Sequence, residues 1–204
     1  MSNKKTILLE YKTRRLHIRV SNRGDYRTWK QCYLEALPSQ NEFDDDLVAK
    51  KDLNYKTFLG TLAHEKTLRE RGQIYFMSAF ERKSGKMIAR VGFTLIQRYN
   101  VQRAYLSYVV INNYWRKGFG RELVKKSAEF AIKSLKIHRL EAEIQPHNKA
   151  SIKLIKSLGF RYEGLKKWAV FFEGKWHDHR VYALTAEDIG ISRRKPNRSL
   201  EICV

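Results

Sequence analysis

Hydrophobic and polar positions change their spacing several times along the chain, and each change predicts a new element. Apolar residues alternate with polar ones over Arg15 to Val20, which predicts a half-buried strand, and a helical period follows over about Tyr26 to Ala36. From Asn41 to Arg71 the pattern is helical but irregular, with the acidic cluster Asp44-Asp45-Asp46 at the expected helix start. The buried candidates of this segment are Phe58, Leu59, Leu62 and Leu68. Further strands are predicted over Ile74 to Glu81, Met87 to Arg98, Ala104 to Val110, Arg139 to Ile144, Phe160 to Phe172 and Trp176 to Leu184.

The clearest helical pattern begins at Gly118. Its apolar and small residues recur at spacings of three and four, which predicts one face packed on a sheet. These residues are Leu123, Val124, Ser127, Ala128, Ala131, Ile132 and Leu135. A shorter helix is expected from the cap Asn148 through Leu158, where Gly159 ends it.

This order of elements predicts an α+β fold, an α/β/α sandwich with a mixed central sheet flanked by helices. The Gly118 helix should connect two adjacent strands, so that its N-terminus lies at the carboxyl end of the strand through Val110. Ligands bind at such places in α/β sheets. The expected organisation is an N-terminal extension over residues 1–12, a single domain over 13–188 and a basic, flexible tail over 189–204.

A basic turn with two glycines, Arg116 to Arg121, predicts a phosphate-binding site at this position. Gly118 and Gly120 lack the Cβ atoms that would keep a ligand from the backbone, and the helix start offers unpaired N–H groups and the positive end of its dipole. The cations of the turn are Arg116, Lys117 and Arg121. The alternative is an ordinary strand-to-helix turn with a solvated basic rim. A dinucleotide fingerprint is excluded because Leu123 stands where it needs a glycine.

Composition adds a strong positive charge. The chain has 204 residues, with 41 Lys and Arg against 21 Asp and Glu and a formal net charge of +20, so polyanions such as ribosomal RNA should attract it. A charged surface that merely tolerates salt is the alternative. The chain shows neither a long apolar run nor a signal peptide, which predicts a cytoplasmic protein without membrane contact. Its two cysteines have no zinc or disulfide spacing, so no metal is expected.

Two separated motifs resemble the GNAT acetyltransferases. They are Trp115-Arg116-Lys117-Gly118-Phe119-Gly120 and the run from Asn148 to Phe160. The runs His138 to Lys149, Glu163-Gly164 and Gly174 to His179 are similar to the RimJ/RimL branch, and the similarity spans about Thr13 to Asp188. This resemblance implies a GNAT fold with a mixed, mostly antiparallel sheet, and acetyl-CoA as co-substrate.

The resemblance also implies cofactor-binding residues. Backbone amides of Arg116, Lys117, Gly118, Phe119, Gly120 and Arg121 should hold the pyrophosphate of acetyl-CoA. Tyr108, Val109 and Val110 match the strand that pairs with the pantetheine arm and polarises the thioester carbonyl, and Asn148 matches a residue that contacts that arm. The chain departs from the family at Trp115, where a Gln or Arg is common.

Acetyl transfer to an amine requires removal of a proton from the nucleophile and a donor for the departing thiolate. By resemblance to a related N-terminal acetyltransferase branch, Glu143 is expected to take the proton, and a structural ion pair with a nearby lysine is the alternative. That branch's proton-donating tyrosine falls at Ile155. Ser151 is the nearest substitute, although it can equally cap the helix that begins at Asn148, and water or Tyr105 are other donors.

Other polar and aromatic residues are interpreted as structural. His138, His147, His177 and His179 have no spacing that favours a metal or a triad. Some aromatic residues are candidates for an acceptor groove, although core positions are the more common role of such residues. These are Tyr33, Phe43, Tyr55, Trp168, Phe171 and Phe172.

The predicted function is transfer of acetyl from acetyl-CoA to a protein N-terminal α-amine, with a ribosomal protein of the N-terminal alanine type as the favoured acceptor. The enzyme is expected to be a monomer or a homodimer. A polyamine or aminoglycoside acceptor is an alternative that calls for an acidic acceptor site, for which Asp44 to Asp46 is the one obvious cluster. A non-catalytic RNA- or ribosome-associated protein with the same fold is the other alternative.

Overall fold

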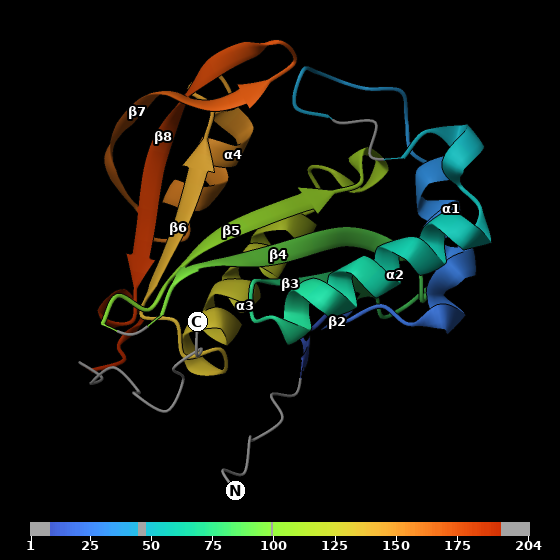
Figure 1. Cartoon of the computed structure of the whole chain (residues 1–204), viewed down its shortest axis with the longest axis horizontal. Helices are drawn as coiled ribbons and strands as arrows, with labels where there is room; N and C mark the ends of the chain where they lie inside the picture. The colour runs from blue at the N-terminus through green and yellow to red at the C-terminus, as the bar shows by residue number, and fades with distance from the viewer. Residues whose placement is uncertain (1–8, 45–47, 99, 193–204) are drawn as a thin grey trace, which may run out of the picture.

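The computed structural model of the chain describes residues 9–44, 48–98 and 100–192. These residues form an eight-stranded sheet with the order β1-β2-β3-β4-β5-β6-β8-β7. The pair β5 and β6 is parallel and every other neighbouring pair is antiparallel. The strands are β1 (Glu10–Lys12), β2 (Leu16–Arg19), β3 (Ile74–Glu81), β4 (Met87–Gln97), β5 (Arg103–Val110), β6 (Arg139–Ile144), β7 (Arg161–Phe172) and β8 (Lys175–Thr185). Figure 1 shows the sheet fanning apart between β5 and β6.

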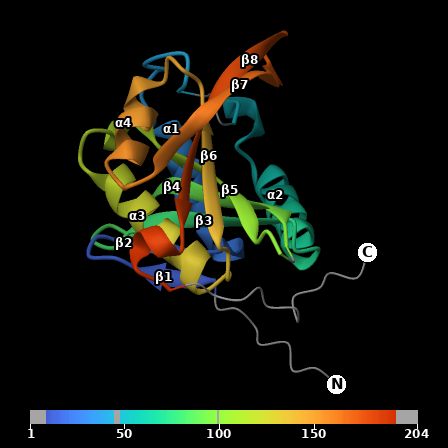
Figure 2. The same ribbon diagram turned by 90° about the vertical axis from the view of Figure 1, so that its left-hand side faces the viewer.

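Four α-helices cover the two faces of the sheet (Figure 2): α1 (Tyr26–Leu34), α2 (Tyr55–Glu70), α3 (Phe119–Lys133) and α4 (Lys149–Lys156). The larger hydrophobic cluster joins α3 and α4 to one face and includes Leu123, Val124 and Ile155. The smaller cluster joins α1 and α2 to the other face through Trp29 and Phe58. The predicted α/β/α sandwich with a mixed, mostly antiparallel sheet is therefore confirmed.

The expected helix start at the acidic cluster is wrong. Helix α2 begins after Asn54, whose side chain accepts a hydrogen bond from the Thr57 amide at 3.0 Å. The Asp44 carboxylate instead accepts hydrogen bonds within a loop, from the Gln40 amide at 2.8 Å and from Asn112. Asp45 and Asp46 lie outside the described residues. Among the described residues 41–44 and 48–54, the 3-10 turn Lys50–Asp52 is the one helical element before α2.

Both ends of the described chain pack against α3 and its surroundings. Strand β1 was not predicted, yet it pairs with β2, and Tyr11 stacks on Phe130 with ring centroids 4.5 Å apart. The Tyr11 hydroxyl lies 2.8 Å from the Ser127 hydroxyl. Near the other end, Ile189 and Ile191 pack against the core. Residues 1–8 and 193–204, which include most of the expected basic tail, lie outside the described residues. No helix in the described ranges is long and apolar enough to cross a membrane.

Helix α3 connects β5 to β6, as its position in the sequence predicts. The residues expected on its inner face are buried, from Leu123 through Leu135. Its first turn follows the carboxyl end of β5 closely, since only the 3-10 turn Asn112–Tyr114 and a short loop lie between them. The fold therefore places the predicted phosphate turn at the opening between β5 and β6.

Candidate active site

Strands β5 and β6 are paired only at their beginnings. The register joins Arg103 to Arg139 and ends where Tyr105 lies opposite Glu141. Beyond this point β5 stays with β4 and β6 stays with β8, so the two strands diverge (Figure 1). A cleft of about 360 Å³ opens between them. It is lined by Leu106, Ser107, Tyr108, Ala142, Glu143 and Ile144 from the two strands. Its size falls in the range of about 300–1,000 Å³ that is typical of small-molecule sites.

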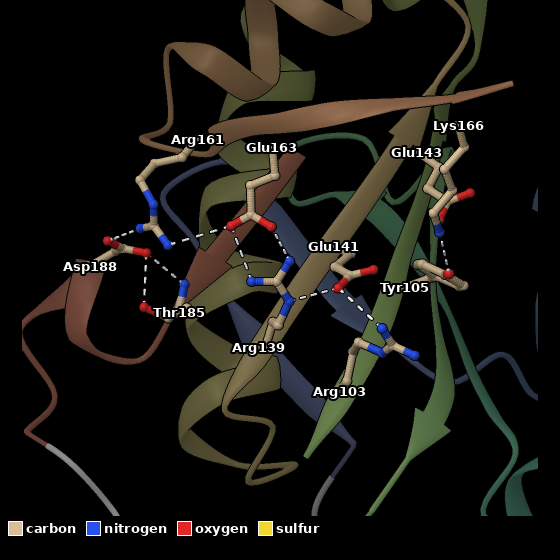
Figure 3. Close-up of polar contacts among 10 residues, drawn as sticks. All are labelled: Arg103, Tyr105, Arg139, Glu141, Glu143, Arg161, Glu163, Lys166, Thr185 and Asp188. Carbon is tan, nitrogen blue, oxygen red and sulfur yellow. Dashed lines mark hydrogen bonds and ion pairs between the residues drawn. The ribbon is translucent and has the colours of Figure 1, made fainter. Parts of the chain in front are cut away.

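A network of ion pairs closes the narrow end of this cleft (Figure 3). Glu141 is 2% exposed and accepts a hydrogen bond from Arg139 Nε at 2.6 Å, while Arg103 Nη1 lies 3.7 Å away. Arg139 also donates to Glu163, and that hydrogen bond is the main cause that raises the pKa of Arg139. Glu141 therefore joins β6 to β5 through Oε1, and it is not among the residues that line the open part of the cleft.

The phosphate turn has the backbone that the glycines predict. Gly118 is the N-cap of α3, with a left-handed φ of 77°, and no side chain caps the helix. The first-turn amides of α3 are therefore available to an anion at the mouth of the cleft. At Gly120 a Cβ atom would point toward the protein, 3.4 Å from Leu154 Cδ2 and 3.7 Å from Val110 Cγ2. Gly120 therefore lies where α3 packs beside α4.

The side chains of the turn are mostly committed to the protein. Lys117 Nζ donates to the Asn113 carbonyl at 2.9 Å, and Arg121 Nη1 donates to the Ser157 hydroxyl at 2.6 Å. The Phe119 ring is buried. These residues would therefore contribute to phosphate binding through their backbone amides. Lys117 and Arg121 would add positive charge near the turn, and Arg116 lies beside them in the sequence.

Arg15, in the turn before β2, braces the phosphate turn, a role that sequence reasoning missed. Its backbone amide donates to Glu122 Oε1 at 2.8 Å and its Nε donates to Oε2 at 2.6 Å. Arg15 Nη1 also donates to the Lys117 carbonyl at 2.8 Å. Burial raises the pKa of Glu122, but the hydrogen bonds from Thr13 and Arg15 outweigh this effect and hold the pKa below its usual value. The one acidic residue in the first turn of α3 is thus paired, which leaves the turn suited to an anion.

Trp115 ties the same turn to the end of β5. Its indole Nε1 donates to the Val110 carbonyl at 2.6 Å. The residue that departs from the family pattern therefore fixes the backbone position of Val110 relative to the turn, whereas its side chain has no free donor for a ligand.

Tyr108 and Ser151, both predicted as site residues, meet across the cleft. Their hydroxyl oxygens lie 2.7 Å apart, and burial raises the pKa of Tyr108. Asn148 caps α4 by accepting a hydrogen bond from the Ser151 amide at 3.0 Å, so the cap is Asn148 and the Ser151 hydroxyl is left for Tyr108. All three residues contribute to the cleft, and a hydroxyl pair on the cleft wall can relay a proton.

Glu143 also lines the cleft, and it forms the ion pair with a nearby lysine that was the alternative to a catalytic role. Lys166 of β7 forms an ion pair with the Glu143 carboxylate, and its Nζ lies 3.2 Å from the Tyr105 hydroxyl (Figure 3). The hydrogen bond that Lys166 donates to Glu143 is the main cause that raises the pKa of Lys166. Burial is the first cause that raises the pKa of Tyr105. The Glu143 carboxylate therefore enters the cleft already paired with a cation.

Two segments outside β5 and β6 complete the cleft. Phe43 and Glu42 line it from the loop between α1 and α2, and Phe172 lines it from the β7–β8 hairpin. The two aromatic residues are among those expected in an acceptor groove. Sequence reasoning missed Asn112, whose buried amide holds this loop through Leu37 N and Leu37 O, both at 2.7 Å, and through Asp44 at 2.8 Å.

The histidines fall into two groups. His138 pairs with Glu187 at 3.0 Å and His177 Nε2 lies 3.1 Å from the Phe172 carbonyl, which agrees with structural roles. His179 differs, because it lines the cleft. Within the described parts of the chain, no group of three or more His, Cys, Asp or Glu residues could hold a metal ion.

Comparison with known proteins places this site in a family. Residues 15–161 match the acetyltransferase (GNAT) domain. The uncharacterized N-acetyltransferase p20 of Bacillus licheniformis is 34% identical over 113 residues, which cover 55% of this chain and 63% of p20. The ribosomal protein uS5-alanine N-acetyltransferase of Escherichia coli (strain K12) is 29% identical over 119 residues, which cover 58% of this chain and 61% of that enzyme. The solved structure of Mycobacterium smegmatis RimJ in complex with CoA-disulfide is 19% identical, with a TM-score of 0.72 over 86% of this chain and 84% of RimJ.

A splayed strand pair with an uncapped helix N-terminus at its mouth defines an acetyltransferase-type domain. The chain belongs to the acetyltransferase (GNAT) family, and its relatives include RimJ-like proteins. The matched segments span less than two thirds of the length of p20 and of the uS5-alanine enzyme. Enzymes of this family use acetyl-CoA as the acetyl donor.

Proposed function

We propose that this protein transfers the acetyl group of acetyl-CoA to the α-amine of a protein N-terminus, and that the acceptor is a ribosomal protein. The observation that carries the proposal is the cleft between the diverging ends of β5 and β6, with the uncapped start of α3 at its mouth. Two observations support this choice of acceptor: the likeness to the uS5-alanine N-acetyltransferase, and the net charge of +20, which favours an approach to the ribosome. The same reasoning predicts a cytoplasmic enzyme.

The residues divide into three roles in this proposal. The first-turn amides of α3, with Arg116, would hold the pyrophosphate. The backbone of Val109 and Val110 would bind the pantetheine arm, because the divergence of β5 from β6 leaves no partner strand on that side. The Val110 carbonyl already accepts from Trp115, so this contact would use the other backbone groups of the strand. Acetyl-CoA supplies an activated acyl group. Tyr108 and Ser151 would relay a proton to the departing sulfur, and Glu143 would attract the positively charged acceptor amine.

The cofactor site is tested by Gly118→Glu. The new side chain would place a carboxylate at the helix N-terminus and would have to adopt a left-handed backbone, so acetyl-CoA binding should be lost in calorimetry. Gly85→Glu is the matched control, because Gly85 has a φ of 69° and nothing within 4 Å of its Cβ position. Wild-type acetyl-CoA affinity in a folded Gly118→Glu variant would contradict the proposed site.

The acceptor is tested by mass spectrometry of N-terminal peptides from cells with and without the gene. We expect one ribosomal protein to lose its N-terminal acetyl group in the deletion, and the purified protein to restore it with acetyl-CoA. Acetylation of spermidine or of an aminoglycoside, with no activity on N-terminal peptides, would instead support a small-amine acetyltransferase. Salt-sensitive RNA binding without any acetyl transfer would support a binding protein.

A further inference from the structure

His179 lies on β8 in the wall of the cleft, together with Glu143 and Phe172. It lies opposite Lys166 of β7, while Val181, two residues further along β8, lies opposite Glu143 of β6. Directly opposed residues share a face of a sheet, and so do residues two apart in one strand. The side chains of His179, Glu143 and Lys166 therefore project from the same face, the face that borders the cleft.

Both ring nitrogens of His179 lack a hydrogen-bond partner among the described residues and are shielded from solvent. No other side chain that lines the cleft has a buried nitrogen or oxygen in this state within the same part of the chain. Buried polar groups are normally paired, because leaving one unpaired costs about 1–3 kcal/mol. An unpaired imidazole beside a substrate cleft can accept a hydrogen bond from a bound substrate when the side chains that cover its nitrogens move aside.

The groups around His179 keep its ring neutral. Burial lowers the pKa of His179 below its usual value of 6.5; Glu143 raises it in part, and His177 and Lys166 lower it further. From the remaining wall, Glu42 lines the same cleft. A neutral imidazole offers a lone pair to a proton at physiological pH. In the Glu143 carboxylate, by contrast, Oε1 already accepts a hydrogen bond from Lys166.

We propose that His179 takes the proton from the acceptor amine, and that Glu143 supports it by attracting the ammonium group and the imidazolium that forms. This inference rests on the proposed acetyl transfer to an amine. Of the three protons on the ammonium nitrogen, one passes to His179, one leaves with the thiol of coenzyme A and one stays on the product amide. The new N–C bond replaces the C–S bond of the thioester, so atoms and charges balance.

The test compares His179→Gln with His177→Gln, a matched control on the same strand whose Nε2 already has the Phe172 carbonyl as partner. For His179→Gln we expect kcat to fall by about 100-fold, in the range of general-base catalysis, with acetyl-CoA affinity unchanged and the acid limb of the pH–rate profile lost. His177→Gln should keep the wild-type kcat. In His179→Ala, added imidazole should restore part of the activity, which loss of a purely structural side chain would not allow.

A second measurement determines the pKa of His179 directly. NMR titration of the wild-type protein should show His179 with a pKa below 6.5, and Glu143→Gln should lower this pKa further because Glu143 raises it. Wild-type kcat and pH profile in His179→Gln, or a pKa at or above 6.5, would overturn the assignment while the acetyltransferase proposal stands. If the wild-type protein binds acetyl-CoA but acetylates no amine, the proposed function fails, and the role of His179 fails with it.

Discussion

Replacing Asn112 with alanine removes the side chain that holds the loop between α1 and α2 against the end of β5. Asn112 is 8% exposed, and its amide makes three hydrogen bonds of 2.7 to 2.8 Å, two with the Leu37 backbone and one with the Asp44 carboxylate. At about 1 kcal/mol for each hydrogen bond, the substitution should lower the free energy that stabilises the closed loop by about 3 kcal/mol. Since about 1.4 kcal/mol is a factor of ten, local opening should become roughly 100-fold more frequent.

The assay is hydrogen exchange at the Gln40 amide. This amide donates to Asp44 Oδ2 at 2.8 Å, the oxygen that also accepts from Asn112, so it reports the closing of the loop at the carboxylate that Asn112 holds. Exchange at Gln40 should become about 100-fold faster in Asn112→Ala, in line with the loss of about 3 kcal/mol. Because Glu42 and Phe43 line the cleft from the same loop, the KM for an acceptor peptide should rise while acetyl-CoA affinity stays unchanged.

Asn113→Ala is the control for this prediction. Asn113 is the neighbouring residue with the same chemistry, but its amide makes one long contact, 3.3 Å to the Glu35 carbonyl. Its replacement should leave the Gln40 exchange rate close to that of the wild type. Equal rates in Asn112→Ala and the wild type, or equal effects of the two substitutions, would refute the role of Asn112 in holding the loop.

Two further predictions concern titrating groups. The pKa of Glu122 lies below its usual value of 4.5 in the folded protein, so this residue stabilises the fold above pH 4.5 and the stabilisation is lost as the pH falls through the lowered pKa. The difference in unfolding free energy between the wild type and Glu122→Gln should therefore be largest near neutral pH and shrink below pH 4.5. A difference that does not change with pH would contradict the stabilising role of the Arg15–Glu122 interaction. Burial raises the pKa of Cys32 to about 12, so in a Cys203→Ser background the folded protein should resist iodoacetamide at pH 8 and react only after unfolding in urea. Rapid alkylation of the folded protein would show that Cys32 is accessible.

Hydrophobic spacing predicted the elements whose ends are set by local signals. The strand predicted over Ile74 to Glu81 has those bounds in the structure, and so has the strand over Arg139 to Ile144. Residue type and bounding turns suffice there: the small and aromatic residues of Ile74 to Glu81 suit a strand, although both of its faces are covered and Met77 to Phe80 are all buried. Strand β1 escaped prediction because its three residues, Glu10 to Lys12, have no period of their own and are held by pairing with β2.

Contacts between distant residues decided what the sequence could not. An acidic residue can cap a helix only if its carboxylate is not already bonded to another donor. The Asp44 carboxylate accepts a hydrogen bond from Asn112, which is 68 residues away in the sequence. Arg15 reaches Glu122 across 107 residues, which no local motif encodes. His179 stood next to Asp178 in a strand and was read as structural, because its lack of a partner is a property of the folded environment.

The segment from Tyr108 to Glu122 contacts α4, the loop between α1 and α2, and the turn before β2. Tyr108 contacts Ser151 of α4, and Asn112 holds the loop between α1 and α2. Trp115 fixes the end of β5, and Arg15 binds Glu122. A ligand that orders the start of α3 therefore also orders the backbone around Asn112, the residue that holds the loop between α1 and α2. Since coupling between two sites is reciprocal, acetyl-CoA should slow hydrogen exchange at Gln40, and Asn112→Ala should remove this effect without removing acetyl-CoA binding. An acetyl-CoA effect on Gln40 that persists in Asn112→Ala would mean that the coupling runs through another element, of which α1 is the nearest, because the loop begins at its end.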